Sequence, residues 1–330
     1  MTSVRVPRRA VLGGIAGASW LALAGCADSP SPDADAESGP ESDTAPDADA
    51  AAGDRGRLRL ATGSAGAVFR EFGAALADIV NREWDGGALE VLHTDASYQN
   101  LHMLAAGDCE LALANIDGEA EGPDDLRALG RVFESVLHVV VPEDSPVASF
   151  ADLAGRVVTC GLPESGTQFT AGVVFDATGV RPEIVHHTQT DAIEALATGE
   201  VEAMLSLTGM PTPAVQKLAA RGGFRLLSIP DAVADVVRAH PDHYLPVTIP
   251  RTAYDGMDAA ETVGVPSLLV CRAGLPDDLA RTLTRIVFTH GEELSAVRPE
   301  AGQINMRTGI ATHPIALHDG SRAWFRAEKP

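Results

Sequence analysis

The sequence has little positive charge. Its 25 lysines and arginines stand against 46 aspartates and glutamates, which gives a formal net charge of −21 at pH 7. Only Lys217 and Lys329 are lysines. A protein that binds nucleic acid has to neutralise phosphates with clustered cations, so this balance argues against nucleic acid as a partner. An acidic protein can still bind a small anion where helix N-termini or a single arginine supply the local field.

The sequence also lacks common catalytic and cysteine motifs. It has no Gly-x-Ser-x-Gly elbow, no His-Glu-x-x-His motif and no Walker loop. None of its four cysteines belongs to a Cys-x-x-Cys pair. Cys109, Cys160 and Cys271 each lie in an apolar stretch, so we expect three buried thiols and at most one disulfide. These absences favour binding without chemistry, and we expect no cofactor.

Histidines are the remaining candidates for metal chemistry. His186 and His187 are adjacent on an expected strand and point to opposite faces, which is poor geometry for chelation. The segment 240–243 holds two histidines and one aspartate, but its spacing matches no recognised metal pattern. A structural role is expected for His313 and His318. We therefore predict no metal site.

The N-terminus predicts export. Arg8 and Arg9 precede the apolar segment VLGGIAGASWLALAG, which is too short to span a membrane comfortably. The segment ends in Leu-Ala-Gly-Cys26, which resembles the lipobox of bacterial lipoproteins. Residues 1–25 are thus predicted to be a lipoprotein signal peptide, with lipidation at Cys26 anchoring the protein to the membrane. Export through the Sec and the twin-arginine pathways both fit the arginine pair.

Residues 26–56 follow as a linker. They are rich in Pro, Ser, Ala and Asp and contain no aromatic residue, so they cannot bury enough apolar surface to fold. We expect the lipidated cysteine and a disordered acidic tether here, with the folded part beginning at residue 57.

The remaining chain contains an internal repeat. A strand pattern (RLRLATG), a helical stretch and a second strand pattern (ALEVLHT) recur in order as RVVTCGL, QFTAGVVFDATGV and EIVHHT. The closest match is LAAGDCELAL at 104–113 against LATGEVEAML at 196–205, where a helix ends at Gly107 or Gly199 before a strand. Two copies of one unit predict two similar α/β lobes.

Ligands of parallel α/β sheets bind at the carboxyl ends of the strands. Those ends carry the segments 63–69, 94–100, 115–117, 163–168, 188–191 and 207–213, which are rich in Gly, Ser, Thr and Asn. Ser165, Gly166 and Thr167 are expected to offer N–H and hydroxyl groups to an anionic ligand, with Ser64 and Gly66 doing so from the other lobe. Ser165 can equally serve as the N-cap of a helix.

Several segments together resemble one known family, the TAXI solute-binding proteins, which are extracytoplasmic receptors of tripartite ATP-independent periplasmic (TRAP) transporters. The resemblance extends from about Leu58 to Phe325. It rests on ATGSAGAVFREFG, SYQNLHMLAAGDCELAL, EDSPVASFADLAGRVVTCGLPESGT, TGMPTPAVQKLA, VTIPRTAYDG and PIALHDG.

The resemblance implies an α/β, two-lobed periplasmic-binding-protein-like fold (type II), with two hinge crossings and a ligand cleft between the lobes. Lobe 1 is expected to comprise residues 57–142 and 249–330, and lobe 2 residues 143–248. The segments 138–141 (HVVV) and 266–270 (PSLLV) are expected as strands near the crossings.

The resemblance and the loop positions together give the expected ligand-binding residues. They are Gly63, Ser64, Ala65, Gly66, Val68, Phe69, Ser97, Asn100, Asn115, Ser165, Gly166, Thr167, Gln168, Thr208, Gly209 and Pro211.

The first loop departs from the family pattern. Gly-Gly-Thr-Tyr-Tyr is typical there, whereas this chain has Gly-Ala-Val-Phe-Arg at 66–70. Two hydroxyl groups are lost, and Val68 and Phe69 make this wall more apolar. Arg70 is either a carboxylate partner or a helix residue facing solvent, paired with an acid such as Glu71. A ligand with one carboxylate and a more apolar body than glutamate would suit this loop.

The sequence therefore predicts a non-enzymatic extracytoplasmic receptor. It would capture a small carboxylate-bearing solute, of the amino acid, dicarboxylate or oxo acid class, and deliver it to a TRAP-type membrane permease. The alternative is an accessory that presents its ligand to a membrane histidine kinase. An enzyme would need an acid/base pair in the cleft, for which Asp117 and Asp191 are the candidates.

Overall fold

The computed structural model describes residues 56–63, 67–95 and 97–328. The predicted signal peptide, Cys26 and most of the tether lie outside these residues, as do Ser64, Ala65 and Gly66. The chain divides into two units, Met1–Ala48 and Asp49–Pro330, and the description below concerns the second.

The described residues form one mixed sheet of ten strands. The strands are β1 (Arg57–Ala61), β2 (Ala88–Leu92), β3 (Leu111–Asn115), β4 (Leu126–Pro142), β5 (Val157–Thr159), β6 (Glu183–Val185), β7 (Ala203–Thr208), β8 (Phe224–Leu226), β9 (Leu245–Ile249) and β10 (Ala260–Arg272). Their order is β2-β1-β3-β10-β4-β7-β5-β6, while β8 pairs with β4 and β9 with β10. Strand β1 is parallel to β2 and β3, and β5 is parallel to β6 and β7.

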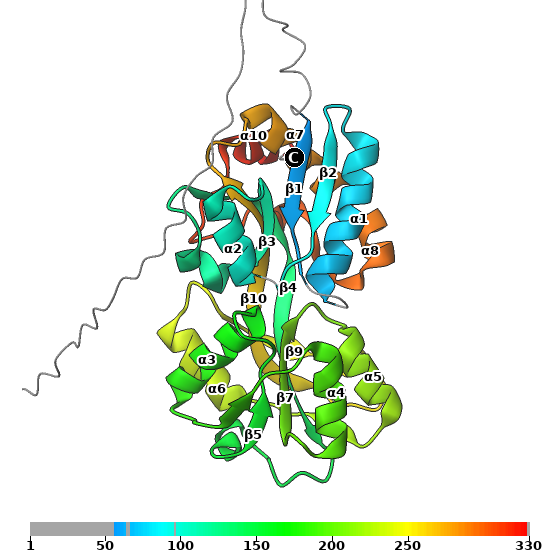
Figure 1. Ribbon diagram of the computed structural model, residues 1–330, viewed down its shortest axis with the longest axis vertical. Coiled ribbons are helices and arrows are strands. Elements are labelled where there is room, and N and C mark those ends of the chain that lie inside the picture. The colour runs from blue at the N-terminus through cyan, green and yellow to red at the C-terminus, as the bar shows by residue number, and fades with distance from the viewer. Residues whose placement is uncertain (1–55, 64–66, 96, 329–330) are drawn as a thin grey trace, which may run out of the picture. The chain divides into compact units, whose positions relative to one another are not determined.

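Two long strands, β4 and β10, join the two halves of this sheet. They pair antiparallel over residues 126–136 and 264–272. Strand β10 also pairs with β3, whereas residues 136–140 of β4 pair with β7. The first half is thus β2-β1-β3 and the second half β7-β5-β6, with β4 and β10 running between them (Figure 1). The strands expected at 138–141 and 266–270 are confirmed as parts of β4 and β10.

Helices follow the parallel strands in both halves. They are α1 (Val68–Glu83), α2 (Ser97–Ala106), α3 (Gly166–Thr178), α4 (Gln189–Thr198), α5 (Pro213–Arg221), α6 (Pro230–Ala239), α7 (Asp277–Thr289), α8 (Gly291–Val297), α9 (Met306–Gly309) and α10 (Asp319–Ala327). Three short 3₁₀ helices are η1 (Ile116–Glu121), η2 (Phe150–Leu153) and η3 (Pro299–Gln303). Within the described ranges, none of the helices combines the length and the apolar character that a membrane crossing needs.

The internal repeat is confirmed. Helix α2 ends at Ala106 before β3, and α4 ends at Thr198 before β7. Gly107 and Gly199 follow these helices with φ of +79° and +77°, a backbone conformation that glycine adopts without a steric penalty. The same sequence signal therefore ends the same kind of helix in both halves.

The expectation of three buried thiols is also confirmed. Cys109, Cys160 and Cys271 are buried and free of disulfides. Burial raises the pKa of each thiol to about 12, which keeps the groups neutral and poorly reactive. They act as small apolar side chains in the core.

Aromatic packing fixes the middle of β4 against α1. Phe133 is 1% exposed, and its ring meets the rings of Phe69 and Phe72 edge-on at centroid distances of 5.8 and 5.3 Å. Because Phe69 also lies in the first turn of α1, this cluster holds the start of that helix against the strand.

We predict that Phe133→Ala lowers the free energy of unfolding by about 3 to 5 kcal/mol, because it leaves a cavity in this cluster. Urea denaturation followed by circular dichroism measures the change. Val297→Ala is the control, since Val297 is 60% exposed and its truncation should change stability by no more than about 0.5 kcal/mol. Equal effects of the two substitutions would contradict the prediction.

Candidate functional site

Four of the described helices begin at one pocket. The first residues of α1, α2, α3 and α4, which are Val68, Ser97, Gly166 and Gln189, all line it. The first N–H groups of a helix have no partner within the helix, and the helix dipole places partial positive charge there. Helix starts from both halves of the sheet therefore direct N–H groups and positive potential towards one small volume, which favours an anion.

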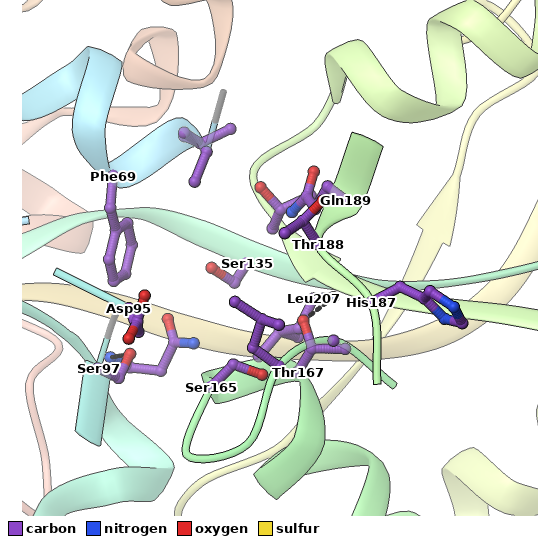
Figure 2. Close-up of a pocket in the computed structure, with 17 residues that line it drawn as sticks. Phe69, Asp95, Ser97, Ser135, Ser165, Thr167, His187, Thr188, Gln189 and Leu207 are labelled. Atoms are coloured by element: carbon purple, nitrogen blue, oxygen red, sulfur yellow. Dashed lines mark hydrogen bonds between the residues drawn. The ribbon is translucent and has the colours of Figure 1, made fainter. Parts of the chain in front are cut away.

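The pocket has a cavity volume of about 70 Å³. Figure 2 shows Phe69, Asp95 and Ser97 on one side, Thr188 and Gln189 across from them, and Ser135 between. The complete lining is Ala67, Val68, Phe69, Asp95, Ser97, Asn115, Ser135, Gly161, Leu162, Ser165, Gly166, Thr167, His187, Thr188, Gln189, Leu207 and Thr208.

Two of the helices carry side-chain caps at the pocket. The Ser165 hydroxyl accepts a hydrogen bond from the Gln168 backbone N–H at 3.2 Å. The Thr188 hydroxyl accepts one from the Asp191 backbone N–H, also at 3.2 Å. The N-cap role expected for Ser165 is thus confirmed. Each cap binds the third N–H of its helix and leaves the first two N–H groups, on residues beside the pocket, unused by the cap.

The floor of the pocket is a hydrogen-bonded group of buried polar side chains. The Ser97 hydroxyl accepts from the Asn115 backbone N–H at 3.1 Å. The Ser267 hydroxyl donates to Asn115 Oδ1 at 2.9 Å and lies 2.8 Å from the Ser135 hydroxyl. All four residues are at most 4% exposed, so their mutual bonds hold them in fixed orientations.

The lining contains no arginine or lysine among the described residues. Its titratable side chains are Asp95 at the exposed rim and His187, which bonds to Thr159 at 3.2 Å and lies 3.4 Å from Glu200. Arg70 does not line the pocket, and Glu71 pairs with Arg298 instead. Attraction for an anion must therefore come from the helix starts and from neutral donors.

The expected site residues fall into three groups. Those that line the pocket are Val68, Phe69, Ser97, Asn115, Ser165, Gly166, Thr167 and Thr208. Those that are described but lie outside its lining are Gly63, Asn100, Gln168, Gly209 and Pro211. Ser64, Ala65 and Gly66 lie outside the described residues.

The residues outside the lining have structural reasons for their positions. The Asn100 amide donates to the carbonyl groups of Thr62 and Leu113, both at 2.7 Å, and so ties α2 to β1 and β3. Gln168 faces a neighbouring open cavity on α3. A Cβ on Gly209 would lie 3.0 Å from both Val68 and Glu300, so this glycine allows close packing.

Several lining residues were not among those expected from the sequence. They are Ala67, Asp95, Ser135, Gly161, Leu162, His187, Thr188, Gln189 and Leu207. The rule that ligands bind at the carboxyl ends of strands covers the loops that hold Asp95 and Thr188. It cannot find Ser135, which lies in the middle of β4.

The two acids proposed for an enzyme do not line the pocket. Asp117 is buried, and its Oδ2 accepts hydrogen bonds from Thr170 at 2.6 Å and Tyr244 at 2.9 Å. Asp191 is exposed and accepts from Thr188 at 2.8 Å. In the described part of the chain, no group of three or more His, Cys, Asp or Glu side chains is placed to hold a metal ion.

Comparison with known proteins gives one family and a shared fold. The model of the NMT1-like family matches residues 60–328. A protein from Bordetella bronchiseptica RB50 shares the fold with a TM-score of 0.52 at 13% identity, covering 82% of this chain and 97% of that chain.

Two further solved structures are similar. The periplasmic aliphatic sulphonate binding protein SsuA from Escherichia coli matches with a TM-score of 0.49 at 18% identity, covering 83% of this chain and 84% of its own. The VFT2 domain of BvgS from Bordetella pertussis matches with a TM-score of 0.47 at 16% identity, covering 76% of this chain and 93% of its own.

We predict that Asp117→Asn becomes more stable relative to the wild type as the pH rises above about 4. Burial raises the pKa of the Asp117 carboxyl, so the folded protein keeps a proton that the unfolded chain releases. The stability that depends on this proton is complete at low pH and is lost as the pH rises through the raised pKa. Asparagine keeps an acceptor for Thr170 and Tyr244 but has no proton to lose.

Urea denaturation at pH 4, 6 and 8 measures the difference between the two proteins, which should grow by no more than about 1.4 kcal/mol per pH unit. Asp191→Asn removes an exposed acid and is the control. A pH dependence that is the same for both substitutions would contradict the assignment to Asp117.

Proposed function

The chain belongs to the NMT1-like family, and we propose that it is an extracytoplasmic receptor that binds a small carboxylate-bearing solute. The observation that carries this proposal is the meeting of four helix starts at one pocket whose described lining has no arginine or lysine. Backbone N–H groups at helix starts bind a carboxylate without any side-chain cation.

The size and lining of the pocket favour a small solute. A cavity volume of about 70 Å³ accommodates about five water-sized groups. Val68, Phe69, Leu162 and Leu207 give the lining an apolar part, which suits the carbon body of an organic acid. A solute with one carboxylate fits better than one with several, since each further charge would need its own donors.

Ligand capture in such a receptor depends on two lobes. We propose lobe 1 at residues 57–142 and 249–330 and lobe 2 at 143–248, with β4 and β10 as the crossing strands. Strand β4 already pairs with β7 from Val136 onwards, so the crossing itself begins before residue 143. A solute held by helix starts from both halves would stabilise the closed arrangement by its differential affinity.

The proposed partner and location rest on the sequence. The resemblance to TAXI proteins supports a TRAP-type permease as the recipient of the solute. A signal peptide at 1–25, lipidation at Cys26 and an acidic tether up to residue 56 would keep the folded part at the membrane, within reach of that permease.

We predict that Cys26→Ala abolishes lipidation and membrane anchoring. The full chain expressed in a bacterial host should incorporate an alkyne-labelled fatty acid and enter the detergent phase in a Triton X-114 partition. The variant should do neither, because the sulfur that would carry the lipid is gone. Incorporation of label by the variant at the wild-type level would rule out Cys26 as the lipidation site.

We predict that the members of one class of small acids raise the midpoint temperature of thermal unfolding of the purified protein. The panel comprises amino acids, dicarboxylates, oxo acids and short apolar carboxylates. At a hundredfold excess over Kd a ligand adds about 2.7 kcal/mol of stability. For a folded part of this size the midpoint should rise by roughly 5 to 10 °C.

Two substitutions on α3 test whether the ligand binds in the pocket, Gly166→Ala and its control Gly172→Ala. A Cβ on Gly166 would lie 3.1 Å from Asn115 Nδ2 and 3.5 Å from Ser97 Oγ, inside the pocket, so affinity should fall about tenfold or more. A Cβ on Gly172 meets nothing within 4 Å, so this variant should bind as the wild type does. A panel without any shift, or equal binding by both variants, would refute the proposed site.

A further inference from the structure

A row of three polar side chains connects the pocket to the strands that join the two halves of the sheet. Asn115 is the last residue of β3, Ser267 lies on β10 and Ser135 lies on β4. Asn115 and Ser135 line the pocket, whereas Ser267 is fully buried behind them. The two contacts in the row measure 2.9 Å from Ser267 to Asn115 Oδ1 and 2.8 Å from Ser267 to Ser135.

The positions of the hydroxyl protons in this row follow from the number of protons that each serine can donate. A serine hydroxyl has one proton, and Ser267 donates its proton to Asn115 Oδ1. The contact between Ser267 and Ser135 must then use the proton of Ser135. Ser135 is left with lone pairs alone for any group in the pocket, so towards a ligand it acts as an acceptor.

Asn115 is fixed as a donor towards the pocket, whereas Ser135 is fixed as an acceptor. Its Oδ1 faces Ser267, so its Nδ2 is turned towards the start of α3, 3.1 Å from the place where a Cβ on Gly166 would lie. The amide protons therefore join the N–H groups of the helix starts as donors. The walls of the pocket thus carry donors, from the helix starts and Asn115, whereas Ser135 between them is an acceptor.

We infer that Ser267 is a positioning residue which makes the pocket select acids that carry a hydrogen-bond donor beside the carboxylate. The inference rests on the proposed function and specifies its solute class. The carboxylate takes the donors of the helix starts and Asn115, and a hydroxyl or ammonium group on the solute donates to Ser135. An oxo group presents only lone pairs to Ser135, and an unsubstituted carbon gives the Ser135 lone pairs no donor, which costs affinity.

The rim of the pocket supports the same selection. Asp95 is the one carboxylate among the described lining residues, and it is exposed at the edge. A carboxylate repels a second anionic group there but accepts from a hydroxyl or an ammonium group. Together the two acceptors favour 2-hydroxy and 2-amino acids over 2-oxo acids and plain acids.

Matched ligand series test the inference on the purified protein by titration calorimetry. One series is propionate, lactate, alanine and pyruvate, and the other is succinate, malate, aspartate and oxaloacetate. In a series that binds, the hydroxy and amino members should bind about tenfold or more tightly than the oxo and unsubstituted members. An oxo acid that binds as tightly as its hydroxy partner would overturn the inference, since it would require Ser135 to donate.

Substitutions show whether Ser267 orients its neighbours in the pocket or only supports the fold. Ser135→Ala should weaken the hydroxy acid about tenfold and leave the oxo acid unchanged. Ser267→Ala lets the Asn115 amide turn and lets Ser135 donate its proton to a ligand. The affinity for the hydroxy acid divided by that for the oxo acid should therefore fall towards one. A loss in Ser267→Ala that is equal for all members of the series would show a purely structural role and overturn the inference.

Ser206→Ala is the matched control. Ser206 is a buried serine on β7 whose hydroxyl has no hydrogen-bond partner among the described residues, and it does not line the pocket. Its substitution should leave the affinity ratio unchanged. If the wild type binds no member of either series, the proposed solute class fails and the inference with it. Binding without discrimination refutes the inference alone.

Discussion

The antiparallel pairing of β4 with β10 holds the two halves of the sheet together. Each strand continues from one half of the sheet into the other, and its pairing partner changes on the way. Along the chain, β10 pairs first with β9 and then with β3, and β4 pairs with β7 from Val136. Both strands are buried along nearly their whole length, so a shift by one residue would move every side chain to the opposite buried face and disrupt the packing on both faces. The junction is therefore a fixed reference for everything around it.

The pocket lies at this junction because of the way in which the parallel strands point. Strands β1, β2, β5 and β6 each lead at their carboxyl ends into one of the helices α1 to α4, and all four helices begin at the same pocket. Facing carboxyl ends thus gather backbone donors from both halves. The crossing strands supply the floor through Ser135, whose hydroxyl is held by Ser267.

Much of this organisation could be predicted from the sequence, because turn chemistry and helix ends are local signals. The turn at Ser165 to Thr167 and the glycines at 107 and 199 are examples. Ser135 could not be found, since a lone serine within a long apolar strand is typical of a satisfied core residue. Asn100 was expected at the pocket from its loop-like surroundings, but its amide is used by two backbone carbonyl groups that only the folded chain brings near.

The absence of arginine and lysine from the described lining has a consequence for how such receptors diverge. The part that would attract the anion is made of peptide groups at helix starts, whose N–H groups every substitution except one to proline leaves in place. On the proposed function, mutations in the lining that leave these N–H groups accessible would alter the shape and polarity required of the remainder of the solute while the affinity for a carboxylate persists. A chain of this architecture would then be able to change the acid that it binds through a few substitutions, without passing through a form that binds none.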